Sequence, residues 1–148
     1  MPDRPNILFL MTDQMQGRLL EPAHPCRTPT MDRLAERGVR FRRAYTSNPV
    51  CSPARAGIMT GLLPHNHGVL WVTHTVDADQ GLLREDKPHF AQRLVDAGYR
   101  TGYFGKWHVE RTEQPGRFGW QTDGSLKSDH WQAYREKLAG GKPTFDLR

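Results

Sequence analysis

The sequence predicts an α/β fold with a mostly parallel sheet, and three observations support this class. A continuous apolar run at residues 7–11 has the pattern of a strand buried in a parallel sheet. Two segments, at residues 28–38 and 88–98, carry the start and stop signals of helices. A short strand is predicted after each helix, at residues 39–45 and 99–104. Strand, helix and strand at this spacing indicate a βαβ unit.

The first apolar run ends in Thr12-Asp13-Gln14. A strand of an α/β sheet delivers the residues at its carboxyl end to the edge where ligands bind. Asp13 and Gln14 offer a carboxylate and an amide oxygen, which are hard ligands suited to Ca²⁺ or Mg²⁺. The alternative is an aspartate that only caps a loop.

The segment at residues 28–38 is predicted to be a helix from its two ends. Thr28 is a suitable N-cap, Pro29 suits the first helical position, and Gly38 suits the end. Its apolar stripe consists of Met31, Leu34 and Ala35.

The most informative stretch is Cys51-Ser52-Pro53-Ala54-Arg55. Residues 53–60 are predicted to form a short helix with Ser52 as N-cap and Gly61 as C-cap. Cys51 then lies just outside the helix N-terminus, where free N–H groups and the dipole favour negative charge. Arg55 adds a fixed cation with a planar fork of donors. These features together describe an oxyanion site, and the alternative is a buried cysteine before an ordinary helix.

A second reactive pair follows the strand predicted at residues 99–104. In an extended segment Lys106 and His108 point to the same side, so both are expected to reach the sheet edge. Lysine is a compact cation for an anionic group, and histidine can move a proton near neutral pH. The alternative is a surface lysine beside a hydrogen-bonded histidine.

The remaining segments carry weaker signals. Residues 62–87 are predicted to be a loop, and its His65 and His67 favour structural or solvent-exposed roles. Residues 109–127 are predicted to be irregular, and a last helix is expected at residues 129–139. Ser128-Asp129-His130 is interpreted as the start of that helix.

Composition excludes several classes of function. The net charge of +5 is scattered and forms no Lys/Arg tract, which argues against nucleic acid as a partner. The two cysteines form neither a disulfide framework nor a zinc motif. The run at residues 7–11 is too short for a signal peptide or a membrane span, so no membrane association and a cytoplasmic location are expected.

Three stretches of the chain resemble sulfatases. Cys51-Ser52-Pro53-Ala54-Arg55 with Thr60-Gly61 resembles the first sulfatase signature, and Gly105-Lys106-Trp107-His108 resembles the second. The apolar strand ending in Thr12-Asp13-Gln14 is similar to the opening of sulfatases and of the wider alkaline phosphatase superfamily. The resemblance implies the N-terminal part of an alkaline-phosphatase-like three-layer αβα sandwich.

The resemblance also implies a nucleophile. Cys51 would be oxidised to formylglycine (3-oxoalanine) by a maturing enzyme, and the aldehyde hydrate would attack a small-molecule or carbohydrate sulfate ester. Asp13, Gln14 and the modified Cys51 would hold Ca²⁺, with Mg²⁺ or Mn²⁺ as alternatives.

The same resemblance assigns roles to the cationic residues. Arg55 and Lys106 would hold the charge that develops in the transition state, and His108 would move a proton. No separate organic cofactor is implied.

The chain departs from the family pattern at Gln14, where most sulfatases have a second aspartate. This departure keeps a phosphonate monoester or phosphodiester hydrolase as an alternative, and a non-catalytic α/β binding module is a third hypothesis. The second metal-binding pair that the family supplies downstream is not recognisable. We therefore expect residues 1–148 to form the N-terminal part of a longer catalytic domain and to be inactive alone.

Overall fold

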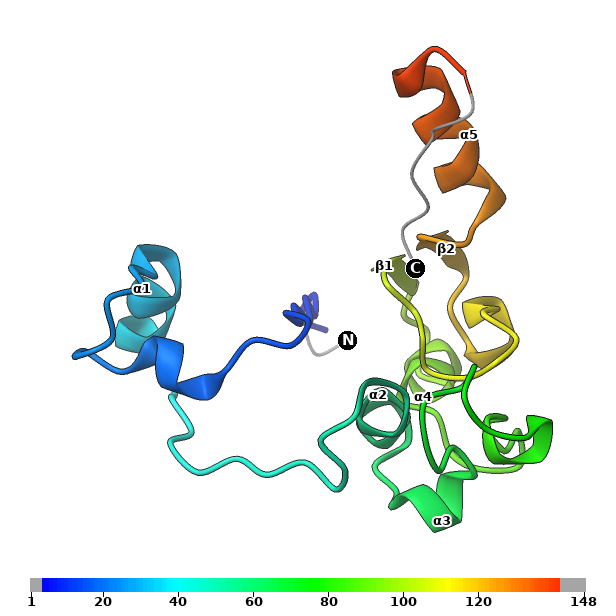
Figure 1. Cartoon of the computed structure of the whole chain (residues 1–148), viewed down its shortest axis with the longest axis horizontal. Helices are drawn as coiled ribbons and strands as arrows, with labels where there is room; N and C mark the ends of the chain where they lie inside the picture. The colour runs from blue at the N-terminus through cyan, green and yellow to red at the C-terminus, as the bar shows by residue number, and fades with distance from the viewer. Residues whose placement is uncertain (1–3, 142–148) are drawn as a thin grey trace. The chain divides into compact units, whose positions relative to one another are not determined.

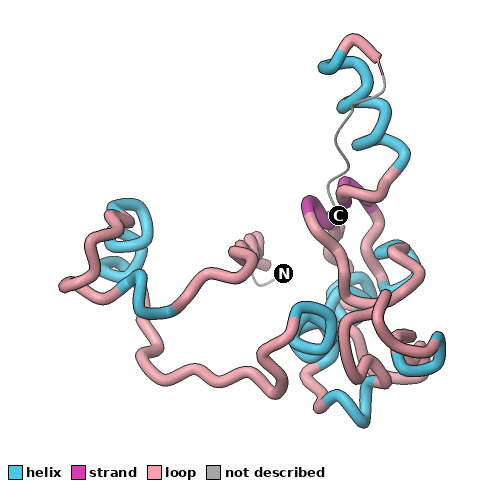
Figure 2. The backbone as a smooth tube through the Cα atoms, viewed as in Figure 1, coloured by secondary structure: helices cyan, strands magenta, loops and turns pink. Residues whose placement is uncertain are grey.

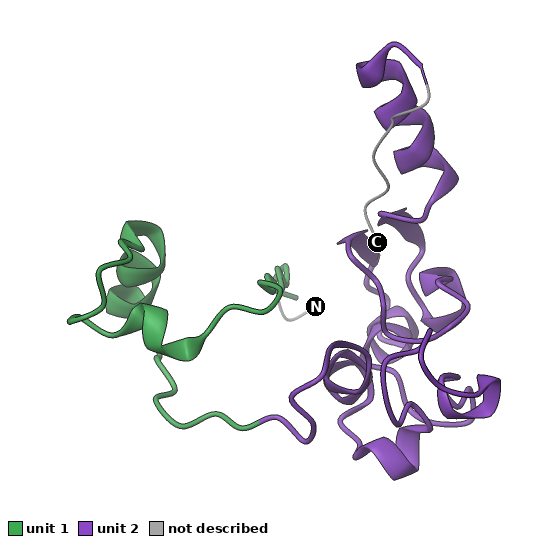
Figure 3. Cartoon of the chain, in the orientation of Figure 1, with its two compact units in different colours: residues 1–45 green, residues 46–148 purple. Residues whose placement is uncertain are grey.

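The computed structural model describes residues 4–141 of the chain. These residues belong to two compact units, residues 1–45 and residues 46–148 (Figure 3). Figure 1 labels the helices and strands, and Figure 2 shows that long loops connect them. Across residues 4–141, the helices are too short or too polar to cross a bilayer.

The first unit contains one 3₁₀ turn and one α-helix. The turn η1 is Gly17–Leu20, and the helix α1 is Pro29–Arg37 with Thr28 as N-cap. Proline occupies the start of α1 and Gly38 its C-cap, which confirms the helix predicted from these end signals.

The strands predicted in the first unit are wrong for the described chain. Residues 5–11 and 39–45 are not strands, and their apolar side chains are exposed: Leu8 is 81% exposed and Phe41 79%. A parallel strand needs hydrogen-bonded neighbours and covering helices before its apolar side chains are buried. Within residues 4–141 the only paired strands lie in the second unit.

The second unit contains most of the regular structure. Its elements in chain order are α2 Cys51–Thr60, α3 Pro64–His67, η2 Ala78–Gln80, α4 Phe90–Asp96, β1 Gly102–Gly105, η3 Pro115–Phe118, β2 Thr122–Ser125 and α5 Asp129–Ala139. The helix predicted at residues 129–139 is confirmed, with the Ser128 hydroxyl accepting from the backbone N–H of Trp131. The helix predicted to open at Pro88 begins at Phe90 instead, with His89 as N-cap.

Two short parallel strands form the sheet. β1 pairs with β2 in a register that joins Gly102 to Thr122 and Gly105 to Ser125. β1 covers only the end of the strand predicted at residues 99–104. β2 lies in the stretch predicted to be irregular. It was not predicted because Thr122–Ser125 has neither the apolar run nor the alternating pattern that indicates a strand.

The hydrophobic core of the second unit joins α2 to the segment after β1. Its buried members are Ala56, Met59, Val69, Leu83, Trp107, Val109 and Phe118. Ala56 and Met59 come from α2, whereas Trp107 and Val109 flank His108. Burial of these side chains holds the two signature segments against each other.

Candidate active site

Helix α2 places Cys51 in its first turn. The helix begins at Cys51 rather than at Pro53, and its N-cap is Val50 in an extended conformation. The expectation that Ser52 caps the helix is therefore wrong. The far end agrees with the prediction, since Gly61 takes the left-handed conformation with φ of 71° at the C-cap. Cys51 is half-buried among the free N–H groups of this helix end.

Lys106 reaches Cys51 from the end of β1. The Nζ of Lys106 donates to Cys51 Sγ over 3.9 Å. The strand ends at Gly105, whose φ of 98° is accessible to glycine and strained for other residues. This turn ends the strand directly before Lys106. The structure thus brings together the two most reactive residues of the two signatures.

Arg55 binds the backbone of the second signature. Its guanidinium donates to the carbonyl of Lys106 at 2.6 Å and to the carbonyl of Trp107 at 3.4 Å. The Tyr103 hydroxyl also donates to the Lys106 carbonyl. Arg55 is only 5% exposed, so it fixes the position of Lys106 from inside the core. This positioning role adds to the charge-stabilising role that the sequence suggested.

Trp107 anchors the segment between the two reactive side chains. It is 1% exposed and packs edge-on against Tyr103, with ring centroids 4.9 Å apart. Its other aromatic neighbour is Phe118, at 5.9 Å between centroids. A large buried ring between Lys106 and His108 limits the freedom of both neighbours.

His108 departs from the extended conformation predicted for it. Its φ is 45°, in the left-handed region that residues other than glycine seldom adopt. Its ring stacks on the ring of His74, with centroids 5.5 Å apart and planes at 16°. Its backbone N–H donates to Oε2 of Glu113 over 3.3 Å.

Glu113 is itself held in an unusual environment. Its φ is 55°, also in the left-handed region. Burial raises the pKa of this carboxyl, and the negative charge of Glu110 acts in the same direction. The bond from the His108 N–H and the charges of Lys127 and Lys106 lower the pKa in part.

The loop that carries His74 is attached to the start of α2. The Thr73 N–H donates to the hydroxyl of Ser52 over 3.4 Å, and both residues are buried. Ser52 follows Cys51 in the chain, and His74 follows Thr73. This bond therefore connects the nucleophile segment to the ring that stacks on His108.

The two other loop histidines differ from each other. His67 is fully buried, and its Nδ1 accepts from the Val69 N–H over 3.2 Å. Burial lowers the pKa of His67 from 6.5 to about 4, and the charges of Arg84 and His65 add to this effect. His65 is exposed. Both positions agree with the structural or solvent-exposed roles expected for these histidines: His67 is buried and His65 is exposed.

Asp13 and Gln14 belong to the first unit, where both side chains are exposed and Gln14 has φ of 51°. One carboxylate and one amide oxygen suit a hard cation such as Ca²⁺ by their chemistry. Within residues 4–141, no three histidine, cysteine, aspartate or glutamate side chains gather at a metal-binding distance. The common metal site of Asp13, Gln14 and Cys51 therefore stays a prediction.

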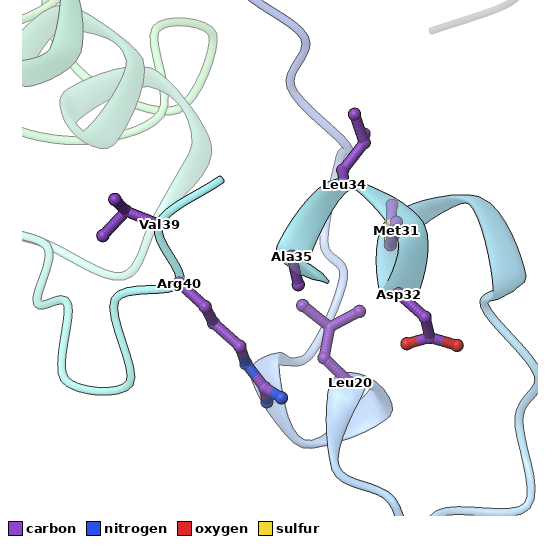
Figure 4. Close-up of a pocket in the computed structure, with 7 residues that line it drawn as sticks. All are labelled: Leu20, Met31, Asp32, Leu34, Ala35, Val39 and Arg40. Atoms are coloured by element: carbon purple, nitrogen blue, oxygen red, sulfur yellow. The ribbon is translucent and has the colours of Figure 1, made fainter. Parts of the chain in front are cut away.

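A pocket of about 190 Å³ lies in the first unit, next to α1 (Figure 4). Its lining is mostly apolar, and Figure 4 shows Leu20 of η1 facing Ala35 of α1. The lining residues are Leu20, Met31, Asp32, Leu34, Ala35, Val39 and Arg40. None of the site residues expected from the sequence is among them.

Sequence analysis did not identify three residues that contact Lys106 and His108. Tyr103 and Glu113 bond the backbone of Lys106 and His108, and His74 stacks on the His108 ring. Tyr103 and Glu113 stand outside both signatures, and His74 lies in a loop without a periodic pattern. Their proximity depends on tertiary contacts rather than on spacing.

Comparison with known proteins identifies the family of this chain. The sulfatase family model matches residues 5–139. An uncharacterized sulfatase of Escherichia coli, YidJ, is 38% identical over 109 residues. The match covers 72% of this chain and 20% of the length of YidJ. A choline-sulfatase of Rhizobium meliloti is 36% identical over 135 residues, covering 81% of this chain and 25% of its own.

A solved structure shows the same fold. The crystal structure of Ps i-CgsB in complex with k-i-k-neocarrahexaose superposes with a TM-score of 0.57 at 29% identity, over 80% of this chain and 28% of that one. The chain thus spans about a fifth to a quarter of the length of the two relatives above. Its α/β architecture corresponds to the N-terminal part of an alkaline-phosphatase-like fold. With both signatures in place and a family match over nearly all its length, the chain belongs to the sulfatase family.

Proposed function

We propose that this chain is the nucleophile-bearing part of an enzyme that hydrolyses sulfate esters. The observation that carries the proposal is the contact between Lys106 Nζ and Cys51 Sγ at the first turn of α2. A reactive side chain, a helix N-terminus and a fixed cation meet there, which suits a group with negatively charged oxygens.

Cys51 is proposed to act as formylglycine rather than as a thiol. The Sγ atom marks the place where the reacting oxygen would lie after oxidation by a maturing enzyme. The modified residue would supply the hydroxyl group that attacks sulfur. The half-buried position in the first helical turn suits a side chain that must meet both solvent and a bound anion.

Lys106 and Arg55 have different roles in stabilising negative charge at the site. Lys106 Nζ lies within reach of any anion at Cys51 and provides a compact positive charge. Arg55 is bonded to the Lys106 carbonyl and sets the position of that charge before substrate arrives. Preorganised charge of this kind stabilises a transition state more than a mobile charge does.

His108 is proposed to move protons. Two observations support this proposal: its ring stacks on His74, and the loop that carries His74 is bonded to Ser52, the residue after Cys51. Histidine side chains ordinarily exchange a proton near neutral pH. His108 would take the proton of the second hydroxyl of the modified residue 51, and the hemiacetal would then collapse to the aldehyde and release sulfate.

Asp13 and Gln14 would hold a divalent cation, for which Ca²⁺ is the first choice and Mg²⁺ or Mn²⁺ are alternatives. When bound, the cation would polarise the sulfate oxygens. The remaining ligands would come from the substrate, from residue 51, from water or from other parts of the protein.

The substrate class is proposed from the relatives. One relative is named a choline-sulfatase, and the solved structure of another is a complex with k-i-k-neocarrahexaose. A small-molecule or carbohydrate sulfate ester is therefore the proposed class.

Two measurements on the full-length protein test the proposal. After co-expression with a formylglycine-generating enzyme, the mass of the peptide containing Cys51 should show the aldehyde. The protein should then turn over an aryl sulfate faster than an aryl phosphonate. Cys51→Ala should abolish turnover, whereas Cys26→Ala, at an exposed free cysteine, should not. A faster reaction with the phosphonate would favour the phosphonate hydrolase instead, and an unmodified thiol would favour a binding module.

A further inference from the structure

His108 is held from two sides by residues outside both sulfatase signatures. His74 stacks on its ring at 5.5 Å between centroids, and Glu113 Oε2 accepts its backbone N–H over 3.3 Å. We propose that His74 and Glu113 are positioning residues, a clamp that fixes the ring and the backbone of His108 for proton transfer. The clamp rests on the proposed function, because it concerns the proton-transfer residue of that reaction.

The backbone half of the clamp stabilises the left-handed conformation of His108. A histidine with φ of 45° is strained by its own Cβ, and such strain persists only where the surroundings hold it. Glu113 provides a direct hold, since its carboxylate bonds the N–H of the strained residue. Val109 and Trp107, both buried, fix the chain on either side. Without the carboxylate, His108 can relax to an ordinary φ, which would redirect its ring.

The ring half of the clamp limits rotation of the His108 side chain. Planes at 16° leave the two stacked imidazoles nearly parallel, so His74 lies beside the His108 ring and limits its rotation. His74 is exposed, and its loop is held by the bond from Thr73 to Ser52, one residue from Cys51. The same bond therefore ties the position of His108 to the nucleophile end of α2.

Substitutions at residues 74 and 113 can separate the shape of each side chain from its ability to carry a proton or a charge. A phenylalanine at residue 74 keeps a flat ring for stacking but cannot carry a proton, whereas an alanine removes the ring. Glutamine at residue 113 keeps an oxygen acceptor, whereas alanine removes it. The conservative variant of each pair should therefore preserve the position of His108, and the alanine variant should release it.

The kinetic test uses the full-length, matured enzyme with an aryl sulfate. His74→Ala and Glu113→Ala should each lower kcat by about 10- to 100-fold, the size of a misplaced catalytic group, with KM within about twofold of wild type. His74→Phe and Glu113→Gln should stay within about threefold of wild-type kcat by the same reasoning. Wild-type kcat in both alanine variants would overturn the clamp. So would an equal loss in His74→Phe, because the imidazole of His74 would then act chemically.

A second test does not depend on turnover. Diethyl pyrocarbonate modifies accessible imidazoles, and the mass of the peptide containing His108 reports its rate of modification. His108 should react faster in His74→Ala than in wild type, and at the wild-type rate in His74→Phe. Equal rates in all three proteins would overturn the clamp.

The two tests separate the possible failures. If the wild-type protein does not turn over an aryl sulfate, the proposed function fails, and the modification rates still decide the clamp. If an alanine variant unfolds, seen as a lost thermal transition, the conservative variant decides. A folded His74→Phe with the wild-type modification rate supports the clamp, and a folded one with a faster rate overturns it.

Discussion

The Nζ of Lys106 lies 3.9 Å from Cys51 Sγ, although the two residues are 55 positions apart in the chain. The contact joins the start of α2 to the end of β1. It places a positive charge beside the residue that the family pattern identifies as the nucleophile.

Replacement of Lys106 should impair both substrate binding and the chemical step. The ammonium group attracts the anion before the reaction and stabilises the charge that develops during it. Lys106→Ala should therefore raise KM, lower kcat and reduce kcat/KM by about 10²- to 10³-fold in the full-length enzyme. Lys106→Arg should recover part of the loss, because it keeps the charge but not the compact shape.

The control for this prediction is Lys137→Ala, at an exposed lysine in the last turn of α5. Its steady-state constants for an aryl sulfate should equal those of wild type. If Lys106→Ala raised KM but left kcat unchanged, the lysine would bind substrate and transition state equally. Its assignment to the chemical step would then be wrong.

Arg55 should contribute to stability as well as to activity. It is nearly buried and donates to the carbonyls of Lys106 and Trp107. Both bonds come from one nitrogen, Nη1, and the ammonium group of lysine on its flexible stem does not reproduce the position of that nitrogen, so the Trp107 carbonyl would lose this donor. Arg55→Lys should lower the free energy of unfolding by about 1–3 kcal/mol, measured by denaturant titration.

Arg93→Lys is the matched control, because Arg93 is exposed on α4. It should change the free energy of unfolding by less than about 0.5 kcal/mol. Equal stability of the two variants would mean that the guanidinium bonds of Arg55 contribute nothing measurable.

The pH dependence of stability should reveal the buried His67. Burial lowers its pKa from 6.5 to about 4, so between these values the unfolded chain binds a proton that the folded chain does not. Stability should therefore fall as the pH decreases from about 6.5 toward 4, and this contribution should level off below pH 4. His67→Asn keeps an acceptor near the position of Nδ1 but does not titrate in this range.

The measured quantity is the difference in unfolding free energy between wild type and His67→Asn as a function of pH. Other titrating groups, such as the buried His89 whose pKa is also lowered by burial, are common to both proteins and cancel. Val69→Ala should lower stability by the same amount at every pH, because it removes a buried side chain without a charge. A difference for His67→Asn that is flat from pH 7 to pH 4 would contradict the lowered pKa.

The outcome for α2 shows which features the sequence predicts well. The end of the helix at Gly61 was predicted from local rules, because a left-handed C-cap depends on one residue. The N-terminus was misplaced, since the Ser52 hydroxyl accepts a bond from Thr73 instead of capping the helix. A competing tertiary partner is not visible in the local pattern.

The strands were predicted less well than the helices, because strands depend on neighbours elsewhere in the chain. The run at residues 7–11 has the right composition, yet burial of a strand depends on neighbours that local sequence does not specify. β2 was missed for the complementary reason, since it forms by pairing with β1 although its residues have low strand propensity. The sequence signatures pointed to Cys51, Arg55, Lys106 and His108, whose catalytic roles stay predictions. The supporting His74 and Glu113 required the folded chain.

The last prediction concerns the two residues of the first unit that are predicted to bind a metal ion. Asp13 offers a charged carboxylate and Gln14 a neutral amide, both on exposed side chains. Ca²⁺ is bound by about six to eight oxygen ligands, and a carboxylate contributes more to its affinity than an amide because it carries charge. In the full-length enzyme, Asp13→Ala should abolish Ca²⁺-dependent activity, and Gln14→Ala should weaken it less.

Calorimetric titration of Ca²⁺ into the metal-free enzyme gives the affinity without reference to turnover. Gln14→Asp adds one negative charge and restores the paired aspartates found in most sulfatases, so it should bind Ca²⁺ more tightly than wild type. Asp32→Ala removes an exposed carboxylate from the first turn of α1 and should leave the affinity unchanged. If Asp13→Ala bound Ca²⁺ as wild type does, residue 13 would not be a ligand. The metal would then have to be held by other parts of the protein.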